Sequence, residues 1–196
     1  MKRSLVVSGS RADYGLLEWP VKMLREDSAF HVEEMRVWGA SVDLAYLEVS
    51  SALSRLTPDL MLILGDRYEI LAAATAAHLQ RIPIAHIGGG DVTEGSYDDA
   101  MRDCISRLAS IHFVTSTSAM ARLSHAGYRN INLVGNPGID FIRHHQGKVA
   151  RPIAEPYVVV NYQAETIDGT IELADVVDAV AGRKSVWIMP NPDRGS

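Results

Sequence analysis

Acidic residues that follow glycine-containing segments are the residues of this sequence best suited to chemistry. Asp66 comes directly after Gly65 and an apolar run, Asp91 follows three consecutive glycines, and Asp98 and Asp99 come soon after. A carboxyl group buried beside an apolar strand acquires a raised pKa, which suits it to proton transfer. Capping the helix expected from residue 68 is the alternative role of Asp66, and complementing a helix dipole is the simpler role of Asp98 and Asp99. We favour catalysis for Asp66.

Metal binding is the other chemistry that clustered acids allow. If the four acids converged they would offer oxygen ligands to Mg²⁺, but no spacing in the sequence is specific for a metal. The seven histidines include no HxxxH or HExxH pair, and the single cysteine, Cys104, rules out an intrachain disulfide and a Cys-rich zinc site. We therefore expect no metal and no cofactor. His86, in an apolar strand, and Cys104, in a helix among apolar residues, are both expected in the core.

Four glycine-rich segments each follow an apolar run: residues 9–15 (GSRADYG), 65–67 (GDR), 88–91 (GGGD) and 135–138 (GNPG). In a parallel sheet the carboxyl ends of the strands share one edge, where open α/β folds bind their ligands. Glycine lets backbone N–H groups approach an anion, and helix N-termini favour negative charge. Arg11 then contacts a ligand, or else forms a solvated ion pair with Asp13 in the same loop. No GxGxxG follows the first strand and no GxxxxGK[ST] is present, which disfavours a dinucleotide fingerprint and a P-loop.

The elements that must position these segments are short apolar strands alternating with helices. Strands are expected over residues 4–7, 32–38, 60–64, 82–87, 111–114, 131–134, 157–160 and 185–189, and helices over 16–25, 43–56, 68–80, 97–108, 116–126 and about 170–181. The strands are continuously apolar, which is typical of a parallel sheet covered by helices on both faces. The sequence therefore predicts an α/β fold with a Rossmann-like parallel sheet.

Two domains joined by a linker are expected. Residues 1–145 form the first domain, residues 146–156, which lack apolar periodicity, form the linker, and residues 157–196 begin a second α/β domain. Two strands and one helix cannot cover both faces of a sheet, so the second domain is incomplete here. We expect its remainder to lie beyond Ser196.

Composition excludes several classes of protein. The 196 residues are 47% hydrophobic and 22% charged with a net charge of −5, which is typical of a soluble globular protein. The absence of a basic block argues against nucleic-acid binding, and the first apolar stretch is too short for a signal peptide or a membrane span. We expect a cytoplasmic protein without membrane or nucleic-acid partners.

The glycine-rich segments together resemble a known family. The strings at residues 9–17 (GSRADYGLL), 64–70 (LGDRYEI), 86–91 (HIGGGD), 98–102 (DDAMR) and 134–140 (VGNPGID) resemble those of the UDP-N-acetylglucosamine 2-epimerases, and most closely the hydrolysing branch that supplies N-acetylmannosamine for sialic-acid-type sugars. The resemblance implies two Rossmann-like domains of the glycosyltransferase-B type, a UDP-sugar substrate, and a homodimer or homotetramer.

The resemblance also assigns roles to residues. Asp66 and Asp99 match acidic catalytic positions, Asp91 stands at a third acidic position, and Arg11 matches an arginine that serves the phosphates. Further substrate contacts are implied at Gly89, Gly90, Arg102, Asn136, Gln163 and Asn191. The implied reaction removes the C2 proton of the sugar, eliminates UDP and adds water, which needs proton-transfer groups on both faces of the sugar.

Three departures from the family pattern keep other functions open. In the segment after the fourth strand, Gly88 stands where many relatives have histidine and Asp91 stands where they have glutamate. Gln163 stands at the position of a second histidine, and Asp103 stands where many relatives have a third. Either the substrate differs or activity is reduced. The alternatives are a non-hydrolysing epimerase, against which the SRADYG string speaks, and a catalytically weak protein that binds a UDP-sugar.

Overall fold

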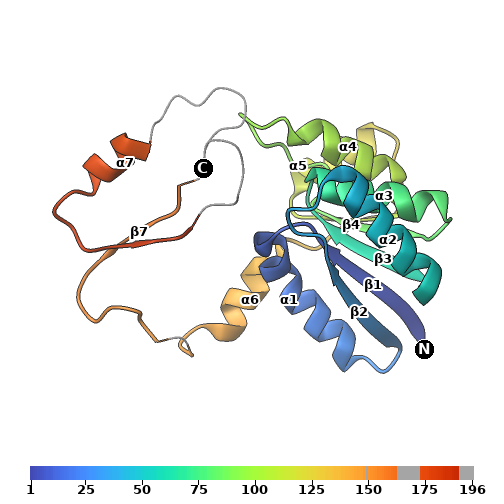
Figure 1. Ribbon diagram of the computed structural model, residues 1–196, viewed down its shortest axis with the longest axis horizontal. Helices are drawn as coiled ribbons and strands as arrows, with labels where there is room; N and C mark the ends of the chain where they lie inside the picture. Colours follow the sequence, from blue (N-terminus) through green and yellow to red (C-terminus); the bar gives the residue numbers. More distant parts are fainter. Residues whose placement is uncertain (149, 163–172, 190–196) are drawn as a thin grey trace. The chain divides into compact units, whose positions relative to one another are not determined.

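A computed structural model of the chain, shown in Figure 1, describes residues 1–148, 150–162 and 173–189. The chain divides into two compact units. The first comprises Met1–Thr93 and Asp98–His144, and the second comprises Glu94–Tyr97 and His145–Ser196. The domain boundaries given by the sequence analysis remain a prediction.

The first unit contains a six-stranded sheet in the order β2-β1-β3-β4-β5-β6, in which every neighbouring pair is parallel. Strands and helices alternate along the chain: β1 (Lys2–Ser8), α1 (Arg11–Glu26), β2 (Phe30–Arg36), α2 (Val42–Leu56), β3 (Leu60–Leu64), α3 (Tyr68–Leu79), β4 (Ile84–Ile87), α4 (Asp98–Leu108), β5 (Ile111–Val114), α5 (Thr117–His125), β6 (Ile131–Leu133) and α6 (Pro137–His145). The predicted α/β class with a parallel sheet is confirmed.

Successive strand residues supply two cores, one on each face of the sheet. On one face, Leu5 and Val7 pack in a buried cluster with residues of α2, α3 and α4. On the other, Val6 packs with Leu17 and Val21 of α1. Figure 1 shows α1 and α6 on one side of the sheet and α2, α3 and α4 on the other. Burial on both faces explains why the strands are continuously apolar.

The strand order reverses at β1, because β2 lies beside it on one side and β3 on the other. In open α/β sheets the crevice beyond the carboxyl ends of the strands, near such a reversal, is the usual ligand site. The four glycine-rich segments follow β1, β3, β4 and β6, so all of them lie at this carboxyl edge. The structure thus brings together segments far apart in the sequence.

Three local expectations were wrong. Arg11 does not lie in a loop: it is the first residue of α1, because the Ser10 side chain caps the helix by accepting a hydrogen bond from the Asp13 backbone N–H at 3.1 Å. Helix α6 was not predicted, although Pro137 at its first position is a known start signal. Cys104 is exposed, because the buried residues of α4 are Arg102, Ile105 and Ser106, on another face of the helix.

The second unit contains the strands β7 (Val158–Val160) and β8 (Ser185–Trp187), which pair in parallel, and the helix α7 (Leu173–Ala179). Lys184 and Glu155 form an exposed ion pair at 2.7 Å. Two parallel strands and a helix are the start of the α/β pattern expected here. Within the described parts of both units, no helix combines the length and apolarity needed to cross a membrane.

Candidate functional site

A small cavity of about 180 Å³ opens at the carboxyl ends of β3 to β6. Four of the predicted site residues line this cavity: the charged residues Asp66, Asp91 and Arg102, and the polar residue Asn136. The rest of its wall consists of Leu16, Leu64, Gly65, Ile87, Gly88, Thr93, Thr115 and Pro137. Its volume is below the range of about 300–1,000 Å³ typical of whole small-molecule sites. The cavity therefore suits one ring or group of a larger ligand.

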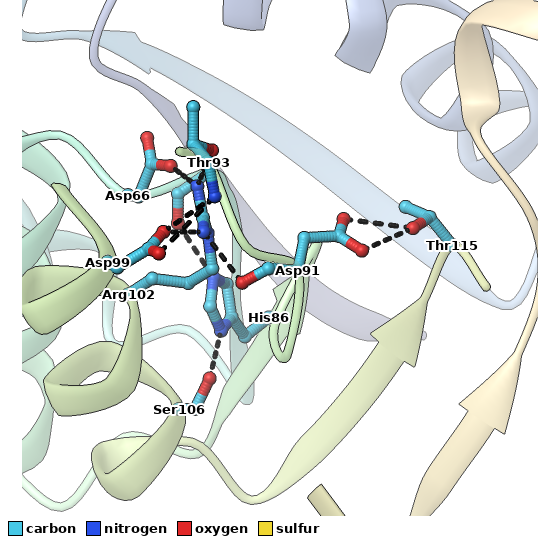
Figure 2. Close-up of polar contacts among 9 residues, drawn as sticks. Asp66, His86, Asp91, Thr93, Asp99, Arg102, Ser106 and Thr115 are labelled. Carbon is cyan, nitrogen blue, oxygen red and sulfur yellow. Dashed lines mark hydrogen bonds and ion pairs between the residues drawn. The ribbon is translucent and has the colours of Figure 1, made fainter. Parts of the chain in front are cut away.

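Arg102 joins two of the predicted acids. Its side chain, buried in α4, ion-pairs through Nη2 with Asp66 and through Nη1 with Asp99, as Figure 2 shows. Nη1 also donates to the backbone carbonyl of Asp91 at 2.7 Å, and Nη2 donates to the Thr93 hydroxyl at 2.8 Å. Burial lowers the pKa of Arg102, but a guanidinium stays protonated in proteins. Both carboxylates therefore face a permanent positive charge.

This arrangement changes two expectations from the sequence. The Asp66 carboxyl does not cap α3, whose N-cap is Arg67 without a side-chain cap bond, and its surroundings are not purely apolar because it contacts Arg102. The terminal nitrogens of Arg102 are directed at acceptors within the protein, so its contacts organise the carboxylates. Asp99 is held further by the Thr93 backbone N–H, which donates to its two oxygens at 3.0 and 3.3 Å.

Asp91 has a different partner. The Thr115 hydroxyl, just after β5, lies 2.8 and 2.9 Å from the two oxygens of the Asp91 carboxylate. Figure 2 shows this carboxylate directed toward Thr115, away from the pair formed by Asp66 and Asp99. The cavity is thus flanked by one arginine-bound acidic group and one hydroxyl-bound carboxylate.

The remaining predicted contacts lie in several places. Asn136 lines the cavity, and its side chain accepts a hydrogen bond from the Gly138 backbone N–H at 2.9 Å. Gly89 and Gly90 are buried and are not among the residues that line the cavity. A Cβ on Gly90 would lie 2.6 Å from the Ala119 carbonyl, so this position packs closely against α5. Arg11 is exposed and does not line the cavity. Gln163 and Asn191 lie outside the described residues.

Asp13 is a buried acid whose environment the sequence analysis missed. It is only 8% exposed, and its Oδ2 atom has no hydrogen-bond partner among the described residues. Burial raises the pKa of Asp13 to about 6, although hydrogen bonds from Ser10 oppose the shift. The sequence alone suggested a solvated ion pair between Asp13 and Arg11 instead. The spacing Ser10-x-x-Asp13 resembles a capping box, in which the side chain three residues after the N-cap turns back toward the backbone. This spacing could have predicted that the Asp13 carboxyl points inward.

The core assignment of His86 is confirmed. Its side chain is fully buried, with Nε2 lying 2.8 Å from the Gly65 carbonyl and Nδ1 lying 3.2 Å from the Ser106 hydroxyl. Among the residues that the structure describes, no group of three or more His, Cys, Asp or Glu side chains is arranged to hold a metal ion.

Comparisons with known proteins identify the family of this chain. The family model described as UDP-N-acetylglucosamine 2-epimerase matches residues 5–196. A Campylobacter jejuni protein named GDP/UDP-N,N'-diacetylbacillosamine 2-epimerase (hydrolyzing) is 41% identical over 87 residues, covering 44% of this chain and 23% of that protein. A Legionella pneumophila protein named UDP-N,N'-diacetylbacillosamine 2-epimerase (hydrolyzing) is 30% identical over 185 residues, covering 74% of this chain and 49% of its own length. The chain thus spans about half or less of the length of these relatives.

A solved structure of S. aureus MnaA with UDP has the same fold. Its TM-score is 0.78 at 16% sequence identity, covering 99% of this chain and 63% of that one. The likeness confirms the predicted fold class. With the family model matching nearly the whole sequence, the chain belongs to the UDP-N-acetylglucosamine 2-epimerase family.

Proposed function

We propose that the protein is a hydrolysing UDP-sugar 2-epimerase and that the cavity beside Asp66 and Asp91 receives the sugar. The observation that carries the proposal is one cavity lined by both Asp66, which is paired with Arg102, and Asp91, which is bound by Thr115. Asp99 does not line the cavity and is joined to it through Arg102. Epimerisation through an eliminated intermediate needs one group to remove a proton and another to return one to the opposite face. Two acidic groups with separate partners meet that requirement.

The proposed reaction has two steps. A carboxylate accepts the C2 proton, the C1–O bond to UDP breaks, and the electron pair of the former C2–H bond forms a C1=C2 double bond. Water then adds its hydroxyl to C1 while a carboxylic acid returns a proton to C2 from the other face. The carboxylate so formed takes the water's remaining proton, and the proton first removed from C2 leaves to UDP or to solvent. The products are free UDP and the 2-epimeric sugar, so atoms and charges balance without a redox partner or metal.

Separate roles follow for the charged residues. Asp66 and Asp99 act on one side of the sugar, with Arg102 holding them in place, and Asp91 acts on the other side. Asp66 lines the cavity, and we assign it as the group that accepts the C2 proton. Arg11, with Gln163 and Asn191, is proposed to contact the substrate outside this cavity, Arg11 at the phosphates. A homodimer or homotetramer is the proposed assembly.

The names of the relatives support the hydrolysing form and narrow the substrate. Both curated relatives described above carry "hydrolyzing" and N,N'-diacetylbacillosamine in their names. We therefore propose a UDP-linked 2-acetamido sugar, either UDP-N-acetylglucosamine or its 6-deoxy diacetamido relative. A test supplies each sugar nucleotide to the whole protein and measures released UDP and the reducing sugar. Release of UDP with a 2-epimeric sugar from at least one substrate supports the proposal. Formation of a UDP-linked epimer without free UDP would favour the non-hydrolysing reaction.

A protein that binds a UDP-sugar without turnover is the second candidate. Two observations favour it: the Asp91 carboxylate points toward Thr115 and away from the other acids, and Gly88 leaves the cavity wall without a side chain. This candidate predicts binding of UDP by calorimetry, no UDP release, and no exchange of the C2 proton with solvent.

A further inference from the structure

His86 connects the two loops that carry the cavity's carboxylates. A carbonyl oxygen only accepts hydrogen bonds, so the contact of 2.8 Å between Nε2 and the Gly65 carbonyl requires the proton on Nε2. Nδ1 then accepts from the Ser106 hydroxyl at 3.2 Å. Burial lowers the pKa of His86 to about 4, so the ring is neutral at physiological pH. One tautomer is therefore fixed by two partners.

The first partner belongs to the loop after β3. Gly65 directly precedes Asp66 and has a φ of +87°, a backbone conformation that glycine adopts readily. A bond to the Gly65 carbonyl fixes the peptide unit from which Asp66 continues. A change in that peptide would move the Asp66 carboxylate relative to Arg102.

The second contact belongs to the loop after β4. A Cβ on Gly89 would lie 2.7 Å from the Ser106 hydroxyl and 3.1 Å from His86 Nδ1. The backbone of this loop therefore packs directly on the pair formed by His86 and Ser106, two residues before Asp91. Ser106 also lies one helical turn after Arg102 in α4. The same buried pair contacts the elements that carry Asp66, Asp91 and Arg102.

We infer that His86, supported by Ser106, is a positioning residue that fixes the separation of the Asp66 and Asp91 carboxylates across the cavity. The inference deepens the proposed epimerase function and rests on it. His86 does not reach the cavity itself, because it is not among the residues that line it. Its effect passes through the Gly65 carbonyl and the Gly89 backbone, so its loss should alter the chemical step more than substrate binding.

A matched pair of variants separates positioning from burial. Gln in His86→Gln offers an amide N–H near the position of Nε2, whereas Met in His86→Met has a similar length and shape without a donor. His112→Met is the control: His112 is buried on β5 in register with His86, but its Nδ1 has no partner in the described part of the chain. The measurements are kcat, KM and the pH dependence of kcat for UDP release.

We expect His86→Met to lower kcat at least about tenfold with KM changed less than about threefold, because misplacing a catalytic group by a fraction of an ångström is costly. His86→Gln should recover kcat to within about threefold of the original protein, and His112→Met should stay within the same limit. The acidic limb of the pH dependence of kcat should shift in His86→Met and should stay as in the original protein in His86→Gln and His112→Met. Equal losses in both His86 variants, an equal loss in His112→Met, or an unchanged kcat in His86→Met would overturn the inference.

Two further measurements keep the inference testable if His86→Met fails to fold or the protein turns over no UDP-sugar. Ser106→Ala removes only the hydroxyl and should lower kcat by about three- to tenfold, the worth of one neutral hydrogen bond, and an unchanged kcat would count against the inference. Nitrogen NMR of the histidine side chains needs no substrate. It should show His86 as the Nε2–H tautomer from pH 5.5 to 8, whereas an Nδ1–H ring or a ring that titrates in this range would overturn the inference without bearing on the reaction.

Discussion

Two buried ionisable side chains at the same edge of the sheet, Arg102 and Asp13, differ in the partners that they contact. Beyond β3 and β4, Arg102 is 4% exposed and its charge is matched by Asp66 and Asp99. Beyond β1, Asp13 is 8% exposed, and its Oδ2 atom has no hydrogen-bond partner in the described structure. A buried charge with partners keeps its ionisation, whereas a buried acid without them shifts its pKa toward neutrality.

The difference separates two kinds of pH response. Arg102 stays charged through the neutral range, whereas Asp13 should gain or lose a proton near pH 6. The Arg102 group is the set Arg102, Asp66 and Asp99. Variants that remove one partner at a time test whether pairing explains this contrast.

Arg102→Met should have the largest effect. It leaves the Asp66 and Asp99 carboxylates facing each other without a cation, which we expect to destabilise the protein by about 2–3 kcal/mol, less than for a fully buried pair because both acids are partly exposed. UDP release should fall about a hundredfold or more. Urea unfolding at pH 7.5 measures the first effect. Arg129→Met, at an exposed arginine that follows α5, is the control and should cost under about 1 kcal/mol. Equal losses in the two variants would show that Arg102 has no special role.

Asp13→Asn should remove a pH dependence of stability. Because the pKa of Asp13 is raised from 3.8 to about 6 in the fold, the folded state retains a proton that the unfolded chain releases between these pH values. The stability that depends on this proton is present below pH 4 and is lost as pH rises through 6, by about 2–3 kcal/mol. Asp13→Asn should therefore be more stable than the original protein at pH 7.5 and nearly equal at pH 4. Glu18→Gln, on the exposed side of α1, is the control. A constant stability difference between pH 4 and 7.5 would contradict the assignment.

Ser10→Ala should have a smaller effect that sharpens the comparison. The loss of the cap on α1 should cost about 1 kcal/mol, and because the Ser10 side chain lowers the pKa of Asp13, the midpoint of the pH dependence should move upward. Ser116→Ala removes the equivalent cap of α5, where the Ser116 hydroxyl accepts from the Ala119 backbone N–H at 3.1 Å. That control should cost about as much without moving the midpoint. Thermal unfolding from pH 4 to 8 measures both, and identical pH profiles would argue against coupling between Ser10 and Asp13.

Thr115→Val should have the smallest effect on stability. It removes the hydroxyl that binds Asp91 but keeps the shape of the side chain, at a cost of about 0.5–1 kcal/mol because water can reach the half-buried carboxylate. UDP release should fall several-fold while the Arg102 group stays intact. A loss of stability as large as that of Arg102→Met would show that the two acidic groups are not independent.

The sheet was predictable because its signals are local and repeated. Continuous apolar runs over residues 60–64 and 111–114 coincide with β3 and β5, since a strand buried on both faces has no polar alternation to obscure it. Helix α6 was missed because its apolar residues are few and none of them is buried. Cys104 was misplaced because a short apolar neighbourhood does not determine which face of a helix is buried.

The sequence predicted which residues form the candidate site, but it did not predict which of their side chains contact one another. Glycine followed by an acid identified Asp66 and Asp91, because backbone position alone places them at the carboxyl edge. The pairing of Asp66 with Arg102 depends on a side chain that reaches across from α4, which no sequence spacing specifies. Asp13 was missed for the same reason: its burial results from the approach of the segments at Gly9 and Gly65.

The most direct test of the proposed chemistry is deuterium incorporation at C2. The whole protein is incubated in deuterium oxide with a UDP-linked 2-acetamido sugar, and the free sugar is examined by mass spectrometry and NMR, beside Asp66→Asn. We predict one deuterium at C2 for each UDP released and a rate at least about a hundredfold lower in Asp66→Asn. Release of UDP with hydrogen retained at C2 would mean simple hydrolysis of the glycosyl bond, and it would contradict the account.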